Sequence, residues 1–178
     1  TLAREVREAI AERVVRWTLP PLWCIAVYTA LTVYLTIGVT QPTRYAPSLV
    51  AGVAFVAVAW LWRKRCWLQA AAILSISANV AIMSAVLLNG LAAPAYWAGL
   101  LLMALVVPLF GMRWAVSSAL LLAAGGGCWL LLHSLGWTLD LSPLPPIVSY
   151  VQYVGYLAVG LIIVAGPHRL LIDALAEG

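Results

Sequence analysis

Long uncharged stretches, separated by short charged or turn-forming segments, dominate the pattern of the chain. A helix needs about 20 consecutive apolar residues to cross the hydrocarbon core of a bilayer. Residues 17–43, 45–62, 66–112 and 114–139 carry no charged residue, and the longest of them has room for two helices divided at NGLAAP, residues 89–94. The pattern therefore predicts six membrane-spanning helices, at about 18–39, 46–62, 67–88, 95–112, 114–136 and 147–167.

The segments on either side of this membrane domain (18–167) are amphipathic. In residues 1–17, apolar side chains recur every four positions at Leu2, Val6, Ile10 and Val14, among charged ones. This predicts a helix that either lies on the inner membrane surface or leads in from the cytosol and packs on a partner chain. Residues 168–178 predict a cytosolic helix that extends the last span, and we expect an output domain to follow it. The segment WTLDLSPLPP (137–146) predicts a proline-rich loop.

Composition narrows the class of protein. The chain of 178 residues is 65% hydrophobic and only 9% charged, whereas a soluble domain carries about 25% charged residues. That excludes a soluble globular domain, and the high hydrophobicity also excludes a disordered chain. The net charge of +4, with no single basic stripe, argues against nucleic acid as a partner. We therefore expect an all-α integral membrane protein whose partner is the lipid bilayer.

The basic residues indicate how the spans are oriented. Six spans place both termini on one side. With the N-terminus inside, one basic residue, Arg44, lies outside, and the other nine lie inside: Arg4, Arg7, Arg13, Arg16, Arg63, Lys64, Arg65, Arg113 and Arg169. The positive-inside rule then predicts that both termini lie in the cytoplasm. Tyr45, Tyr96, Trp97 and Trp137 would form an aromatic belt at the outer interface.

The expected spans hold little catalytic chemistry. No Asp, Glu, Lys or Arg lies in the middle of a span, which argues against proton-coupled transporters and pumps. Ser117 and Ser118 lie toward the inner side and His133 toward the outer side, so a buried serine hydrolase is not supported. No cysteine pair has a metal or redox spacing. We expect no catalytic residue, metal site or cofactor in this chain.

Neutral polar and aromatic side chains gather in the outer halves of several spans. Tyrosines recur every three residues in the last span, with a glutamine among them, and a tryptophan and a histidine lie four apart in the fifth. We interpret them as the lining of a pocket for a small amphipathic or lipid-like ligand, with interfacial aromatics and helix packing as the alternative. The candidate residues are Tyr150, Gln152, Tyr153, Tyr156, Trp129, His133, Tyr34 and, in the third span, Asn79.

Two glycine-containing segments are candidates for a moving joint. Gly125, Gly126 and Gly127 lie inside the fifth span, where they allow either very close helix approach or a bend. Gly166 and Pro167 lie at the inner end of the last span. The hypothesis is that these residues form a hinge that transmits a signal.

Several segments carry a resemblance to a known family. They are RVVRWTLPPLW (13–23), LWRKRCW (61–67), PLFGMRWAVSSALLLA (108–123), LDLSPLPP (139–146) and GPHRLLIDALAEG (166–178). The layout resembles the hexahelical sensor modules at the N-terminus of bacterial sensor histidine kinases, and related layouts precede diguanylate cyclases and membrane adenylyl cyclases. The resemblance implies a homodimer in a bacterial inner membrane, whose last helix feeds a coiled-coil linker to a PAS, kinase or cyclase domain.

Two other functions remain open at this stage. The length and number of spans also suit the substrate-binding membrane subunit of a vitamin-type transporter, which would need a mid-membrane polar pocket. A structural anchor without a ligand would tolerate substitution of Gln152 and Tyr153.

Overall fold

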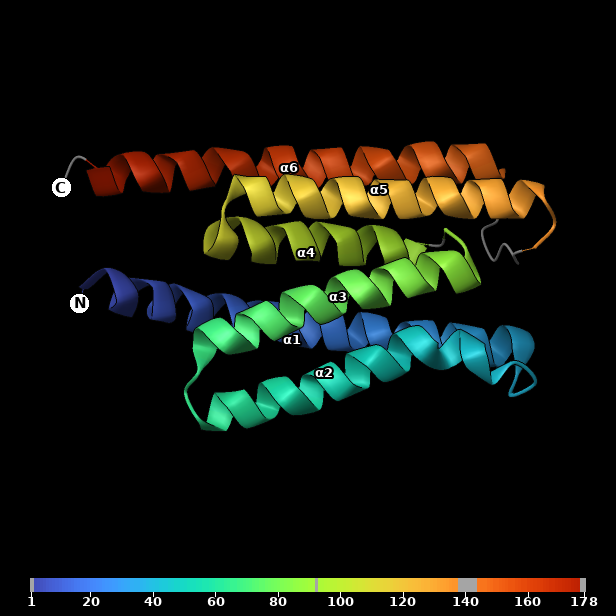
Figure 1. The fold of residues 1–178 in the computed structure, drawn as a ribbon, viewed down its shortest axis with the longest axis horizontal. Coiled ribbons are helices and arrows are strands. Elements are labelled where there is room, and N and C mark those ends of the chain that lie inside the picture. Colours follow the sequence, from blue (N-terminus) through green and yellow to red (C-terminus); the bar gives the residue numbers. More distant parts are fainter. Residues whose placement is uncertain (1, 92, 138–143, 177–178) are drawn as a thin grey trace.

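The structure is a computed structural model that describes residues 2–91, 93–137 and 144–176, with side chains described for most residues between 5 and 164. Every regular element in these ranges is a helix, and no strand occurs among them (Figure 1). The elements are α1 (Leu2–Ile37), the 3-10 helix η1 (Pro42–Tyr45), α2 (Ala46–Arg63), α3 (Trp67–Asn89), α4 (Ala93–Phe110), α5 (Met112–Ser134) and α6 (Pro146–Ala176).

The chain is a multi-pass membrane protein by the length and composition of its helices. Within the described residues, five segments are long and apolar enough to cross a bilayer: Glu5–Thr36, Pro42–Arg63, Trp67–Asn89, Met112–Ser134 and Pro146–Val164. The remaining helix, α4, has 18 residues and no charged residue. It contacts α1, α3, α5 and α6, so α4 is a central helix of the bundle.

The helices run side by side in an elongated bundle (Figure 1). The α2–α3 hairpin packs together most closely, α5 and α6 pack on the other side of α4, and α1 lies between α4 and the hairpin. Both chain ends lie at one end of the bundle. We call the opposite end, where α1, α3 and α5 finish, the distal end. The core is apolar and includes the fully buried Leu102 and Met103 of α4.

The expected spans and the observed helices agree to within two residues at their ends, apart from the start of α1 and the end of α6. The difference at the start is instructive. Residues 1–17 were expected as a separate helix, but α1 runs without a break from Leu2 through Pro20 and Pro21 to Ile37. Ala11 and Val15 are fully buried within this chain. Their packing favours straight continuation of the helix over a turn onto the membrane surface.

The C-terminal helix is also continuous. The backbone of α6 is helical from Pro146 to Ala176 and so passes through Gly166 and Pro167 without ending. The side chains of these two hinge candidates lie outside the described part of the chain, as do residues 138–143 of the expected proline-rich loop.

One side chain ties α1 to the α2–α3 turn near the chain ends. The Arg16 guanidinium carbon lies 5.4 Å from the ring centroid of Trp62 and 5.9 Å from that of Trp67. The two indoles pack edge to face at 5.0 Å. Arg16 also forms an ion pair with Glu12, one helical turn earlier, with 2.6 Å between its Nη2 and Glu12 Oε1. A cation over aromatic faces is attracted by the ring quadrupole.

We expect Arg16→Gln to lower the free energy of unfolding by about 0.5–1 kcal/mol, the range for a largely exposed cation–π contact. The Arg16 side chain is 56% exposed, which sets the low end of the range. Thermal unfolding in detergent measures the change. Arg13→Gln, at an exposed position on the same helix, is the control. Equal midpoints for the two variants would mean that the indoles do not hold Arg16.

Candidate ligand-binding site

Aromatic side chains of three helices meet toward the distal end of the bundle. We call them the aromatic cluster: Tyr96 and Trp97 of α4, Trp129 and His133 of α5, and Tyr150, Tyr153 and Tyr156 of α6. Trp129 and Tyr153 are fully buried. The cluster therefore lies between α4, α5 and α6, with Trp129 and Tyr153 closed off from the surface.

The rings of the cluster stack on one another. Trp129 and His133 lie parallel with centroids 5.3 Å apart, as their four-residue spacing on one helix allows. Tyr96 stacks on Tyr156 at 5.3 Å and lies 6.0 Å from Tyr153. Such offset and edge-on pairs stabilise packing beyond the area that they bury. They fix α4 and α6 against each other.

The three glycines of α5 make room for neighbouring side chains. A Cβ at Gly126 would lie 3.1 Å from Tyr150 Cε2 and 3.2 Å from Tyr153 Cδ1. A Cβ at Gly125 would overlap Met83 Sδ of α3. Close approach is therefore the role that these contacts support. The hinge hypothesis for Gly125, Gly126 and Gly127 stays a prediction.

Three polar atoms of the cluster are buried without a hydrogen-bond partner: Trp129 Nε1, His133 Nδ1 and Tyr153 Oη. By contrast, the Tyr96 hydroxyl donates to the Ser149 carbonyl at 3.2 Å. A buried polar group without a partner costs about 1–3 kcal/mol, and hydrocarbon supplies none. Buried groups of this kind in a native protein call for an explanation, of which a bound molecule is one.

The chemistry of these atoms defines what they can bind. An indole N–H only donates, a phenol hydroxyl donates and accepts, and an imidazole nitrogen does either according to its tautomer. The surrounding rings are flat and apolar. The cluster suits a small molecule with an apolar body and at least one hydrogen-bond acceptor, placed against Trp129 and Tyr153.

The structure brings five of the eight sequence-predicted ligand residues into this cluster and separates the other three. Gln152 is exposed on α6, whereas the adjacent Tyr153 is buried. Tyr34 is 56% exposed on α1, a helix that does not contact α5 or α6 within the described residues. Both positions are therefore unsuited to the cluster.

Asn79 lies elsewhere between α3 and α5. Its Nδ2 donates to the Ser75 carbonyl at 3.0 Å and to Ser118 Oγ at 3.3 Å. Ser118 precedes Trp129 by eleven residues, about 16 Å along a helix. Asn79 therefore makes an interhelical hydrogen bond, which agrees with helix packing, the alternative interpretation of these polar residues.

Tyr96 is a buried cluster residue that the sequence did not reveal. We expected it in an interfacial belt with Trp97, yet it is only 8% exposed, whereas Trp97 is 57% exposed. Both residues follow a turn at the edge of a span. Hydropathy alone does not distinguish an aromatic residue that faces the lipid from one that is buried between helices. The tyrosine repeat of α6, two of whose rings contact Tyr96, was the sequence feature that could have indicated a buried aromatic partner on another helix.

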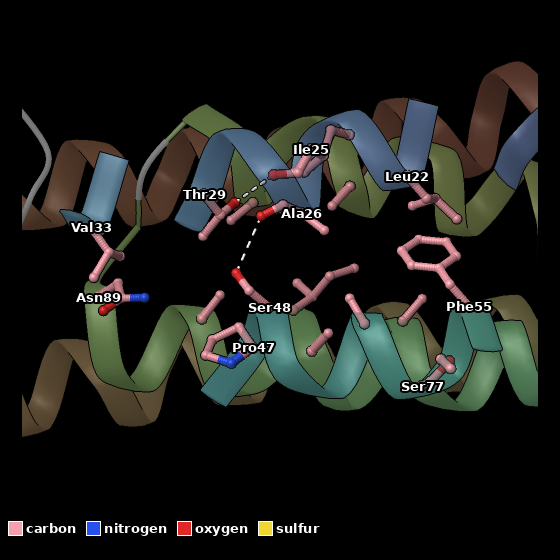
Figure 2. A pocket seen from close by; sticks show the side chains of 18 of the residues that line it. Leu22, Ile25, Ala26, Thr29, Val33, Pro47, Ser48, Phe55, Ser77 and Asn89 are labelled. Atoms are coloured by element: carbon pink, nitrogen blue, oxygen red, sulfur yellow. Dashed lines mark hydrogen bonds between the residues drawn. The ribbon is translucent and has the colours of Figure 1, made fainter. Parts of the chain in front are cut away.

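A second feature, a cavity of about 90 Å³, lies between α1 on one side and α2 and α3 on the other (Figure 2). Eight of its 21 lining residues are alanines, among them Ala26 of α1, Ala51 of α2, Ala81 of α3 and Ala98 of α4. Ser48 of α2 donates across it to the Ala26 carbonyl at 3.2 Å. None of these residues was singled out from the sequence, because alanines in an apolar helix leave no distinctive pattern.

Among the residues that the structure describes, no three His, Cys, Asp or Glu side chains are grouped so that they could hold a metal ion. No known protein family, curated protein or solved structure matches the chain. The membrane-spanning bundle and the aromatic cluster are therefore the features that bear on function.

Proposed function

We propose that the chain is a membrane-embedded sensory module, which passes the binding of a small ligand at the aromatic cluster to the opposite end of the bundle through α6. The observation that carries the proposal is the set of three unpartnered buried polar atoms on α5 and α6. One of them, Tyr153 Oη, belongs to a helix that continues without a break to Ala176. The helix α6 is thus part of the candidate site and is also the candidate output element.

The proposed topology has six spans, with α4 as the sixth, and both termini in the cytoplasm of a bacterium. Three observations support it. The helix α4 is uncharged and surrounded by the other spans. The two chain ends lie at the same end of the bundle (Figure 1). Nine of the ten basic residues fall on that side of the spans, with Arg44 as the exception.

The mechanism is a shift between two packings of α6. A ligand that accepts a hydrogen bond from Trp129 of α5 and from Tyr153 of α6 favours the packing in which both donors reach it. Only such a difference in affinity between two states can move their equilibrium. Since α6 has 31 residues, about 46 Å at 1.5 Å per residue, a displacement at Tyr153 is carried to the cytoplasmic end by a single helix.

The rest of the proposal comes from the resemblance to hexahelical sensor modules. It supplies a homodimer and a cytosolic output domain, with a histidine kinase as the first choice. In a dimer, α6 helices of two copies would move relative to each other and change the packing of the linker that follows them.

A kinase chimera tests this function. The 178 residues are joined to the dimerisation and catalytic region of a sensor histidine kinase, and autophosphorylation is measured in membranes. Trp129→Phe and Tyr153→Phe each remove a polar atom and keep an aromatic ring. We expect each to change kinase output about fivefold, because a hydrogen bond of about 1 kcal/mol shifts a two-state equilibrium by that factor.

Matched controls use exposed residues of the same types. Tyr34→Phe on α1 and Trp114→Phe on α5 lie at positions that are 56% and 66% exposed, and neither should change kinase output. Insertions of one to four residues after the last helix check that the chimera transmits. If these insertions change kinase activity while Trp129→Phe and Tyr153→Phe leave it unchanged, the cluster is not the input site.

A further inference from the structure

The cavity between α1, α2 and α3 is long and narrow. Its lining runs from Leu22 and Phe55 to Val33 and Asn89 at the distal end (Figure 2). On α1 this is eleven residues, about 16 Å of helix. The wall is apolar, and the polar Ser48 and Thr29 in it direct their hydroxyls to the backbone carbonyls of Ala26 and Ile25. An unbranched hydrocarbon chain fits this shape and this surface.

The distal end of the cavity has a different chemistry. Asn89 is 5% exposed and lines the cavity. Its Nδ2 donates to the Arg44 carbonyl at 3.2 Å, while its Oδ1 is buried without a partner. An amide oxygen in this state calls for a hydrogen-bond donor.

Arg44 adds a positive charge at the same end. Its guanidinium donates to the Leu88 carbonyl, and its Nε donates to Gln41 Oε1 at 2.5 Å. A guanidinium has five N–H donors, so these two contacts leave donors for an anionic group such as a phosphate. The apolar segments Glu5–Thr36 and Trp67–Asn89 both end at this level, which is where lipid headgroups lie.

From these observations we propose that the cavity is a binding site for one bilayer phospholipid. An acyl chain lies along the alanines between α1 and the α2–α3 hairpin, the phosphate pairs with Arg44, and the headgroup donates a hydrogen bond to Asn89 Oδ1. The donor requirement selects a headgroup with an N–H or O–H group, as in phosphatidylethanolamine and phosphatidylglycerol. This site is separate from the aromatic cluster and does not depend on the sensory function.

Native mass spectrometry of the delipidated full chain in a mild detergent tests the proposal. Phosphatidylethanolamine, phosphatidylglycerol or phosphatidylcholine with identical acyl chains is added back, and retained lipid is counted. We expect one tightly retained molecule of the first two, and at least about fivefold weaker retention of phosphatidylcholine, which lacks a headgroup donor. Equal retention of all three lipids would overturn the assignment of Asn89.

Three variants and one control locate the site. Ala81→Phe and the milder Ala51→Leu fill the cavity and should abolish the tight lipid, whereas Ala59→Phe, on the exposed side of α2, should not. Asn89→Leu should retain lipid but lose the headgroup preference. Circular dichroism and size-exclusion chromatography establish that each variant is folded. Unchanged retention by folded Ala81→Phe or Ala51→Leu would overturn the site itself.

Discussion

Replacing Gly126 with valine is expected to force α5 and α6 apart and to lower the free energy of unfolding by about 1–3 kcal/mol, the usual effect of overfilling a packed core. Even a single Cβ at this position would lie 3.1 Å from the ring of Tyr150 and 3.2 Å from that of Tyr153. Tyr153 is fully buried, so its ring cannot turn out into the surroundings of the bundle. The two further methyl groups of valine extend the overlap into the aromatic cluster.

Gly155→Val is the matched control for this substitution. Gly155 lies on α6, and a Cβ there would have no neighbouring atom within 4 Å. Both variants add the same side chain to a glycine inside a membrane helix, so any cost of the branched side chain to the helix is shared. Thermal unfolding in detergent should separate them clearly. Similar midpoints would show that α5 and α6 do not approach each other as closely as the structure places them.

The spans could be predicted from the sequence because the signal for them is local. A charged residue or a turn-forming segment such as Asn89-Gly90 interrupts an apolar run at the point where the helix ends. Each boundary depends on a few neighbouring residues, and no knowledge of the fold is needed. The continuity of α1 was not predicted, because it depends on contacts between helices and not on neighbouring residues. The burial of Ala11 and Val15 depends on other helices.

The composition of the cluster was only partly predictable. In a membrane protein, apolar residues face both the lipid and the core, so hydropathy does not distinguish the two faces of a span. Gln152 and Tyr153 illustrate this. In a membrane span the more polar side chain is expected to face the other helices and not the lipid. Here, however, the glutamine is exposed and the adjacent tyrosine is fully buried. Which face of α6 is buried follows from the glycines of α5 and from Tyr96 of α4.

The difference in burial between Gln152 and Tyr153 determines which substitution can test the sensory function. Tyr153→Ala would remove a fully buried ring, and deletion of a large core side chain costs about 3–5 kcal/mol. A loss of signalling in that variant would follow from unfolding alone. Gln152→Ala would alter an exposed position outside the cluster. Tyr153→Phe instead keeps the ring and removes only the hydroxyl.

In the absence of ligand, Tyr153→Phe is expected to raise the free energy of unfolding, by up to about 1–3 kcal/mol, because it deletes a buried hydroxyl that has no partner. The ring contact with Tyr96, at a centroid distance of 6.0 Å, is retained. The gain in stability should come with a loss of ligand response. Chemical and thermal unfolding of the purified chain in ligand-free detergent measure the change in the free energy of unfolding.

Tyr96→Phe makes the same chemical change with the opposite expected sign. The Tyr96 hydroxyl donates to the Ser149 carbonyl at 3.2 Å, so its removal should lower the free energy of unfolding by about 0.5–1.5 kcal/mol. Two buried tyrosines on neighbouring helices thus differ in whether their hydroxyls are paired. If Tyr153→Phe is destabilising to the same degree as Tyr96→Phe, the Tyr153 hydroxyl is already satisfied without a ligand, and the observation on which the sensory function rests is lost.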